Sequence, residues 1–311
     1  MILVAGSANL DFVVRASHIP APGETVLGHD FQTFPGGKGA NQAVACARAG
    51  AVTTHLLLAL GSDPYAAPIE ASLREAGVHL HTVRVPDQPT GTAFICVSDQ
   101  AENAITVAPG ANNALRPGDL PALAGFSHLL LQLETPLETV TAYAQAARTQ
   151  GVTVVLNAAP ARALPTDLLA LVDVLVVNEG ELATLSPQPG TLAQRLERLA
   201  VPCGVVTLGA RGCCARQGDR WWLQPGFSVA ALDTTAAGDS FCGALTAALG
   251  RQEPLDAALR QASAAGALAC TRRGAQASIP TQAEVSALLE TQPDTSTQAL
   301  LALQQYCGIT P

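Results

Sequence analysis

The chain has 311 residues, of which 48% are hydrophobic and 14% are charged. This is enough apolar material for a sizeable buried core, and it excludes a largely disordered protein. The 17 basic and 25 acidic residues give a net charge of −8, so we expect neither nucleic acid nor an anionic membrane as a partner.

Short apolar strands alternate with longer helical segments along most of the chain. Strands are expected at 2–8, 55–60, 128–133, 152–157, 174–178 and 204–208, and helices at 40–49, 66–76, 137–149, 191–199, 237–249 and 255–272. Near-continuous apolar strands are typical of a parallel sheet that is covered on both faces. The pattern therefore predicts a doubly wound, mostly parallel α/β domain over residues 1–290.

Two stretches interrupt this alternation. Residues 12–34 are rich in proline and glycine, and residues 79–108 contain three strand-like runs, 80–85, 92–97 and 104–107, without a helix between them. We expect both stretches to form antiparallel strands outside the main sheet, which pair as a small β-sheet lid over the strand ends. The tail, 291–311, is predicted to be an extension with a short helix.

Targeting signals and redox motifs are not visible. Met1 leads directly into a strand-like run, and the apolar runs are too short to span a bilayer. The eight cysteines form no Cys-x-x-Cys pair and no zinc spacing. A reduced, cytoplasmic location is the expectation.

Polar residues follow two of the predicted strands. Asn9 and Asp11 come directly after the first strand, two residues apart, and Glu134 follows the strand at 128–133. These side chains offer the hydrogen-bonding groups that a polyol such as a sugar needs. Each of them alone is more often a turn or capping residue, so the assignment depends on their meeting in space.

A glycine-rich segment, Pro35-Gly-Gly-Lys-Gly-Ala-Asn-Gln-Ala43, precedes the first predicted helix. Its glycines allow close backbone approach, while Lys38 and Asn41 supply polar donors. It is not a Walker A loop, which requires Gly-x-x-x-x-Gly-Lys-Ser/Thr. A structural connector is the alternative interpretation.

Two further motifs end predicted strands. Glu181 in Asn178-Glu-Gly-Glu181 could hold Mg²⁺ through water or orient phosphate oxygens. The segment Thr207-Leu-Gly-Ala-Arg-Gly212 could wrap a nucleotide, or it could be a plain glycine-rich turn.

The segment Asp233-Thr-Thr-Ala-Ala-Gly-Asp239 joins an extended run to the helix at 237–249. Small residues at a helix start leave backbone N–H groups free to bind a phosphate or a developing oxyanion. Asp239 in the first turn could accept a proton from a hydroxyl that attacks a γ-phosphate. On spacing alone, an ordinary residue that compensates the helix dipole is at least as good an interpretation.

Taken together, these motifs resemble the PfkB carbohydrate kinase family, and within it the ribokinase branch. The segment at 36–42 resembles the first family signature, and 233–239 resembles the second; the motifs follow the family's order over residues 1 to roughly 290. The resemblance implies a ribokinase-like fold and ATP-dependent phosphorylation of D-ribose at O5. It also implies Mg²⁺ and an activating K⁺ as cofactors, and a homodimer formed through the lid.

The resemblance also implies roles for individual residues. Asp239 matches the catalytic base, and the amides of Ala236, Ala237 and Gly238 match an anion hole. The positions that match sugar-binding residues are Asn9, Asp11, Gly37, Lys38, Asn41, Glu134 and Asp239. The nucleotide side is matched by Asn178, Glu181, Thr207, Leu208, Gly209, Ala210, Arg211, Gly212, Gly238 and Ser263. The cation loops are matched by Asp233, Thr235, Ala269, Arg272, Gly274 and Ser278.

Alternatives to ribose phosphorylation remain open at this point. A kinase for another small sugar or a nucleoside would share the motifs, although a nucleoside kinase should have a more aromatic lid. A silent sugar-binding regulator would be expected to lose Asp239 or Lys38, and both are present. A dinucleotide-dependent oxidoreductase would need Gly-x-Gly-x-x-Gly after the first strand, which is absent here.

Overall fold

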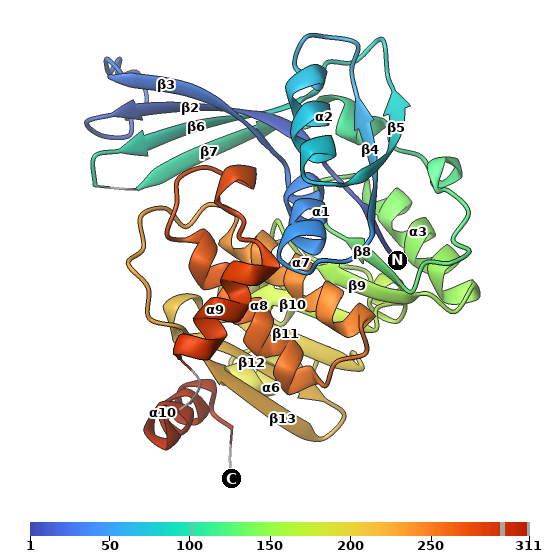
Figure 1. Ribbon diagram of the computed structural model, residues 1–311, viewed down its shortest axis with the longest axis vertical. Helices are drawn as coiled ribbons and strands as arrows, with labels where there is room; N and C mark the ends of the chain where they lie inside the picture. Colours follow the sequence, from blue (N-terminus) through green and yellow to red (C-terminus); the bar gives the residue numbers. More distant parts are fainter. Residues whose placement is uncertain (101, 293–295, 310–311) are drawn as a thin grey trace.

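The computed structural model describes residues 1–100, 102–292 and 296–309. A nine-stranded sheet forms its centre, in the order β13-β12-β11-β10-β9-β8-β1-β4-β5, and a second sheet has the order β3-β2-β6-β7 (Figure 1). The strands of the large sheet are β1 (Ile2–Ala5), β4 (Thr54–Leu60), β5 (His79–Arg84), β8 (His128–Leu131), β9 (Thr153–Asn157), β10 (Val174–Asn178), β11 (Cys203–Thr207), β12 (Gly212–Gln217) and β13 (Arg220–Pro225). All of its neighbouring strands are parallel except β11–β12 and β12–β13. The predicted doubly wound, mostly parallel fold is confirmed.

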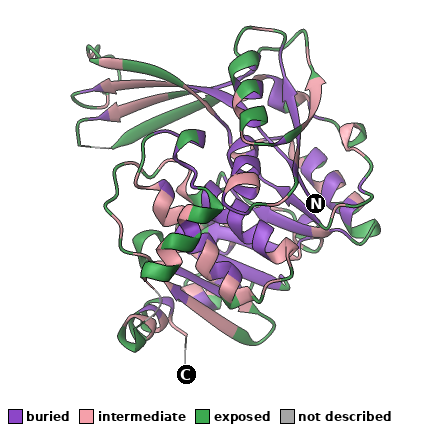
Figure 2. Cartoon of the chain, in the orientation of Figure 1, coloured by how far each residue is buried: buried purple, intermediate pink, exposed green. Residues whose placement is uncertain are grey.

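Helices cover both faces of the large sheet. The helices are α1 (Lys38–Arg48), α2 (Ala66–Glu75), α3 (Leu137–Thr149), α4 (Thr166–Leu169), α5 (Glu179–Leu185), α6 (Leu192–Glu197), α7 (Ala237–Gly250), α8 (Leu255–Ala269), α9 (Gln282–Thr291) and α10 (Thr297–Cys307). One apolar core contains α1, α2, α7, α8 and α9, and the other contains α3, α4, α5, α6 and α10. Figure 2 shows the buried residues concentrated in the sheet between these layers. No helix in the described ranges is long and apolar enough to cross a membrane.

The small sheet projects from the body as the predicted lid. Its strands are β2 (Asn9–Ala16), β3 (Asp30–Gly36), β6 (Gly91–Ser98) and β7 (Asn103–Ala108). Two details differ from prediction. The run at 80–85 does not belong to the lid, because β5 pairs in parallel with β4 in the large sheet. In addition, β2 and β6 pair in parallel rather than antiparallel.

The wrong prediction for the run at 80–85 has a local cause. Helix α2 separates β4 from β5, and Gly77 at φ +78° turns the chain directly from α2 into β5. This is a β-α-β unit, which returns the chain to the same sheet in parallel. The lid therefore consists of two ribbons that leave the body after β1 and after β5.

Candidate active site

The candidate site lies at the carboxyl ends of the parallel strands. Strand β1 has β4 on one side and β8 on the other, so the direction of winding reverses at this point. Ligands of open α/β sheets bind in the crevice at such a switch point. Strand β2 of the lid begins at Asn9, only four residues after β1 ends, which brings the lid to the same edge.

Glycines seat helix α1 directly on the end of β1. Gly37 has φ +89°, and a Cβ atom there would lie 2.8 Å from Cα of Ala8. A Cβ atom on Gly39 would lie 2.6 Å from the carbonyl carbon of Gly6. Only glycine permits this approach. It brings the first turn of α1, with Lys38 and Asn41, into the crevice.

Asp239 is anchored by α1. It lies in the first turn of α7 and is 8% exposed. Its Oδ2 accepts a hydrogen bond from Nδ2 of Asn41 at 2.9 Å, and its Oδ1 accepts one from Nε2 of Gln42 at 2.9 Å. Two helices separated by almost 200 residues therefore fix this carboxylate in one orientation.

The N-terminus of α7 presents backbone amides next to that carboxylate. Ala236 has the left-handed conformation, φ 59°, and no side chain caps this helix start. The first N–H groups of a helix lack intrahelical acceptors, and Gly238 carries no side chain to shield them. Ala236, Gly238 and Asp239 line a cavity of about 210 Å³ together with Lys38 and Glu181. This geometry suits a phosphoryl group.

A polar set for a sugar surrounds Asp239 on the lid side. Oε2 of Glu134 accepts hydrogen bonds from Oγ of Ser7 at 2.6 Å and from the amide of Lys38 at 3.1 Å. The buried atoms Asp11 Oδ1 and Asn41 Oδ1 have no hydrogen-bond partner among the residues that the structure describes. Because buried oxygens without partners cost free energy, hydroxyl groups of a bound polyol would satisfy them.

Charges in the site are strongly coupled. Burial, together with the nearby carboxylates of Glu134 and Asp239, raises the pKa of Asp11 to about 7. Burial lowers the pKa of Lys38, but the carboxylates of Asp239, Glu134 and Glu181 outweigh it, so the net pKa is raised and Lys38 stays charged. Lys38 is therefore the cation that faces several carboxylates in this crevice.

The predicted nucleotide residues line an adjoining cavity of about 580 Å³ between the β11–β13 end of the sheet and helices α7 and α8. Its walls include Thr207, Gly209, Ala210, Gly212, Gly238 and Ser263. Leu208 is buried behind them, and Arg211 lies outside the lining. The two cavities share Thr207 and Gly238, so a ligand could extend from one into the other.

Asn178 and Glu181 form a capping box at the start of α5. The amide and Nδ2 of Asn178 donate to Glu181 at 2.7 and 2.9 Å, while the amide of Glu181 donates to Oδ1 of Asn178 at 2.8 Å. Both residues line the smaller cavity. Carboxylate and amide oxygens fit Mg²⁺ chemically. Since both carboxylate oxygens already accept hydrogen bonds, contact through water is the arrangement that fits.

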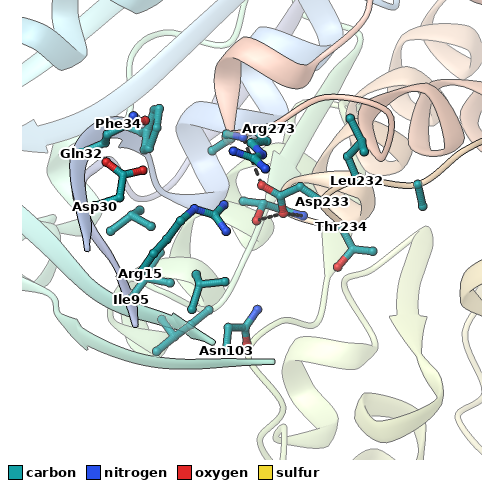
Figure 3. A pocket seen from close by; sticks show the side chains of 17 residues that line it. Arg15, Asp30, Gln32, Phe34, Ile95, Asn103, Leu232, Asp233, Thr234 and Arg273 are labelled. Atoms are coloured by element: carbon teal, nitrogen blue, oxygen red, sulfur yellow. Dashed lines mark hydrogen bonds between the residues drawn. The ribbon is translucent and has the colours of Figure 1, made fainter. Parts of the chain in front are cut away.

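The two candidate cation loops, one at Asp233–Thr235 and one at 269–278, lie next to each other. Oδ1 of Asp233 accepts from the amide and Oγ1 of Thr235 at 2.9 and 2.6 Å, and its Oδ2 accepts from the amide of Gly274 at 3.1 Å. The carbonyl of Ala269 accepts from the amide of Arg272 at 3.4 Å, whose side chain pairs with Glu284. Figure 3 shows Asp233 facing a pocket of about 330 Å³ beneath the lid. Ser278 is buried behind the turn and donates to the carbonyl of Ala275.

The side chains and backbone groups of these loops determine whether they could hold a cation. The half-buried carboxylate of Asp233 links its own loop to Gly274 of the second loop, and no ion pair of Asp233 is found in the described ranges. Hard oxygen ligands of this kind suit K⁺. The residues present therefore fit the group.

Several site residues were not predicted from the sequence. Gln42 links Asp239 to the sheet, since its Nε2 also donates to Asn157 and its Oε1 accepts from Gln132 at 2.7 Å. Asn112 donates to Oδ1 of Asn9 at 2.8 Å. Asn157 ends a predicted strand just as Asn178 does, so the same rule could have found it. Asn112 belongs to Gly110-Ala-Asn112, which resembles a family phrase, but that resemblance assigned it no role.

Comparison with known proteins assigns the family. The model of the pfkB family carbohydrate kinases matches residues 1–282, and the chain belongs to that family. A ribokinase from Haemophilus influenzae is 39% identical, with 93% of this chain and 98% of the relative covered. Among solved structures, a ribokinase from Thermotoga maritima is 36% identical with a TM-score of 0.85, covering 93% of this chain and 99% of that one. A ribokinase from Arabidopsis thaliana complexed with ribose and ATP is 33% identical with a TM-score of 0.86, covering 93% and 98%.

Proposed function

We propose that this carbohydrate kinase is a ribokinase, which transfers the γ-phosphoryl group of ATP to O5 of D-ribose. The observation that carries the proposal is the buried cluster around Asp239, where Asn41 holds the carboxylate while the Oδ1 atoms of Asp11 and Asn41 lack partners. A small polyol supplies hydroxyl donors to both atoms. The similarity to ribokinases over more than nine-tenths of the chain supports ribose as that polyol.

Asp239 would act as the general base in this reaction. Its carboxylate accepts the proton of the sugar's primary hydroxyl as that oxygen forms a bond to the γ-phosphorus and the bond to the β-phosphate oxygen of ATP breaks. The hydrogen bonds from Asn41 and Gln42 keep the carboxylate aimed at the crevice. Because the carboxylate is already oriented before the substrate binds, the reaction does not include the free-energy cost of orienting it.

The amides at the start of α7 would stabilise the transferring phosphoryl group. The residues that would supply them are Ala236, Ala237 and Gly238, at the positive end of the α7 dipole. The amide of Ala237 donates to the carbonyl of Thr234 at 3.3 Å, so it would have to share or exchange that bond with the phosphoryl group. Lys38 lines the same cavity and adds a positive charge. Mg²⁺, when bound, would neutralise phosphate charge, and Asn178 and Glu181 are the residues that would hold it through water. Chelation with EDTA should abolish turnover, and added Mg²⁺ should restore it.

K⁺ is proposed as an activator. The loop of Asp233 and Thr235 continues directly into the anion hole at Ala236, so a cation bound to Asp233 would shape the amides that hold the phosphoryl group. The carbonyls of Ala269, Arg272 and Gly274, with Ser278 behind them, would complete the site. Replacing Na⁺ by K⁺ should raise turnover, whereas Asp233→Ala should abolish that response. The exposed Asp219→Ala should retain it.

We further propose a cytoplasmic homodimer that forms through the lid. Strand β7 is exposed along its whole length although its sequence is mostly apolar, and Phe31 and Phe94 of the same sheet are 62% and 54% exposed. Exposed apolar surface of this kind favours association. The free cysteines fit a reducing compartment.

A coupled ADP-release assay tests the proposed function. Purified protein would be given Mg·ATP and each member of a panel of D-ribose, 2-deoxy-D-ribose, D-fructose and adenosine. D-ribose should give the highest kcat/KM. A higher value with another acceptor would keep the kinase and overturn the substrate, and no ADP release with any acceptor would contradict the kinase assignment.

A further inference from the structure

Helix α10 belongs to the C-terminal extension beyond the family match, and it packs on the body rather than standing away from it. It contacts β13, and Leu303 and Cys307 are buried in the core that also contains Cys214 of β12. The thiol of Cys214 donates a hydrogen bond to Cys307 and thereby lowers the pKa of Cys307. A Cβ atom on Gly308 would lie 2.4 Å from Cβ of Thr191, so the end of the helix is also seated against the start of α6.

Tyr306 of α10 connects two segments of the nucleotide side. Its hydroxyl donates to Oε1 of Glu179 at 2.7 Å, and Glu179 directly follows Asn178 at the end of β10. The guanidinium carbon of Arg211 lies 4.4 Å from the centre of the Tyr306 ring. Arg211 ends the short turn that follows β11. One side chain from outside the family match at 1–282 therefore contacts both strand-end motifs.

The turn that Arg211 ends contains two glycines and is closed by a backbone hydrogen bond from the amide of Leu208 to the carbonyl of Gly212 at 2.8 Å. Gly209 and Gly212 both have positive φ, 57° and 106°, and glycines leave a loop many alternative conformations. Gly209, Ala210 and Gly212 line the cavity of about 580 Å³, whereas the side chain of Arg211 leaves the cavity and stacks on α10. A cation over an aromatic ring is attracted to it. The contact between Arg211 and Tyr306 therefore holds the turn from the side opposite the cavity.

We propose that Tyr306 is a positioning residue for nucleotide binding: by holding Arg211 and Glu179, α10 keeps the 207–212 wall of the cavity in the shape that binds ATP. The inference rests on the proposed kinase function and extends it to the C-terminal helix. Tyr306 touches neither ATP nor sugar in this account. It acts by reducing the conformational freedom that the loop would lose when the nucleotide binds.

Calorimetric titration with ATP in the absence of sugar tests the proposal directly. We expect Tyr306→Leu, which removes the ring and the hydroxyl, to raise the Kd for ATP by roughly two- to tenfold. Tyr306→Phe keeps the ring under Arg211 and should lose less. Leu301→Ala, at an exposed position of the same helix, is the matched control and should bind ATP as the unaltered protein does.

Kinetics and a double-mutant cycle separate positioning from general destabilisation. Tyr306→Leu should raise KM for ATP and leave KM for the sugar unchanged. In an Arg211→Leu background, the Tyr306→Leu change should have a smaller further effect, because only the hydrogen bond to Glu179 is then left to lose. Unchanged ATP affinity in Tyr306→Leu, fully additive losses in the cycle, or an equal rise of both KM values would overturn the proposal. If ATP binds normally but ribose is not phosphorylated, only the proposed substrate fails.

Discussion

Asp239 owes its orientation to side chains from another helix. A carboxylate that only compensated the α7 dipole would need no partner on α1, yet both of its oxygens accept hydrogen bonds from Asn41 and Gln42. The same residue lies between the amides of α7 and the unpartnered oxygens of Asp11 and Asn41. A capping residue does not require this arrangement, which is why we propose Asp239 as the catalytic base.

Asp239→Asn separates the two interpretations. The amide keeps the shape and removes the base, so we expect kcat to fall by about 10²- to 10⁴-fold with little change in sugar KM. Asp256→Asn is the matched control, since Asp256 is exposed and occupies the first turn of α8. Near-normal turnover of Asp239→Asn, or an equal loss in Asp256→Asn, would contradict a catalytic role.

Asp11 should destabilise the sugar-free protein above neutral pH. Its pKa is about 7 in the folded state against an ordinary 3.8, so the folded protein binds the extra proton between these values. Stability from this group is therefore complete below pH 3.8 and is lost as the pH rises to 7. Asp11→Asn cannot ionise, and its advantage in unfolding free energy over the unaltered protein should shrink by roughly 2–3 kcal/mol from pH 8 to pH 5.

Urea unfolding at the two pH values measures this difference. Asp11→Asn should also bind ribose more weakly, because the carboxylate that lowers the stability of the free protein is one of the proposed sugar-binding groups. Equal advantages at pH 5 and pH 8 would show that Asp11 titrates normally in the folded protein. A matched exposed substitution, Asp87→Asn, should show little dependence on pH.

At the scale of elements, glycine contacts decide where α1 begins. The sequence predicted close backbone approach at 36–39 from the glycines, but it could not say what would be approached. The structure supplies the answer: Gly39 lies against the end of β1 at Gly6. This contact aligns Asn41 and Gln42 with Asp239.

Gly39→Ala should therefore lower the free energy of unfolding by about 1–3 kcal/mol, because a Cβ atom 2.6 Å from backbone forces α1 away from β1. Gly118→Ala is the control, since nothing lies within 4 Å of its Cβ position. Thermal unfolding measures both. Equal midpoints for the two variants would show that α1 tolerates the shift.

Prediction of elements succeeded where the pattern was local and failed where pairing was long-range. Six of the seven parallel strands of the large sheet follow from apolar runs, and α1, α2, α3, α6, α7 and α8 follow from periodicity, whereas α4, α5 and α9 were not predicted. The run at 80–85 was assigned to the lid because no helix follows it, whereas the preceding α2 determines its sheet. Likewise Asn112 reaches Asn9 across 103 residues, a contact that no local pattern encodes.

At the scale of the whole molecule, the lid carries apolar side chains that remain exposed in the single chain. Phe94 and Ile105 lie at exposed positions on opposite faces of neighbouring lid strands, since Ile105 pairs with Ile95 and lines the pocket beneath the lid. Sedimentation velocity should find a dimer, and at least one of Phe94→Lys and Ile105→Lys should dissociate it by burying a charge in the interface. A monomeric unaltered protein, or two dimeric variants, would contradict assembly through the lid.

We propose that the site formed by α1, α7 and the start of β2 transfers phosphate to O5 of ribose. NMR of the product formed from ¹³C-labelled D-ribose and Mg·ATP tests it most directly. Phosphorus coupling to C5, present with the unaltered protein and strongly reduced with Asp239→Asn, is the predicted result. Phosphate on another oxygen, or no phosphorylated ribose at all, would contradict it.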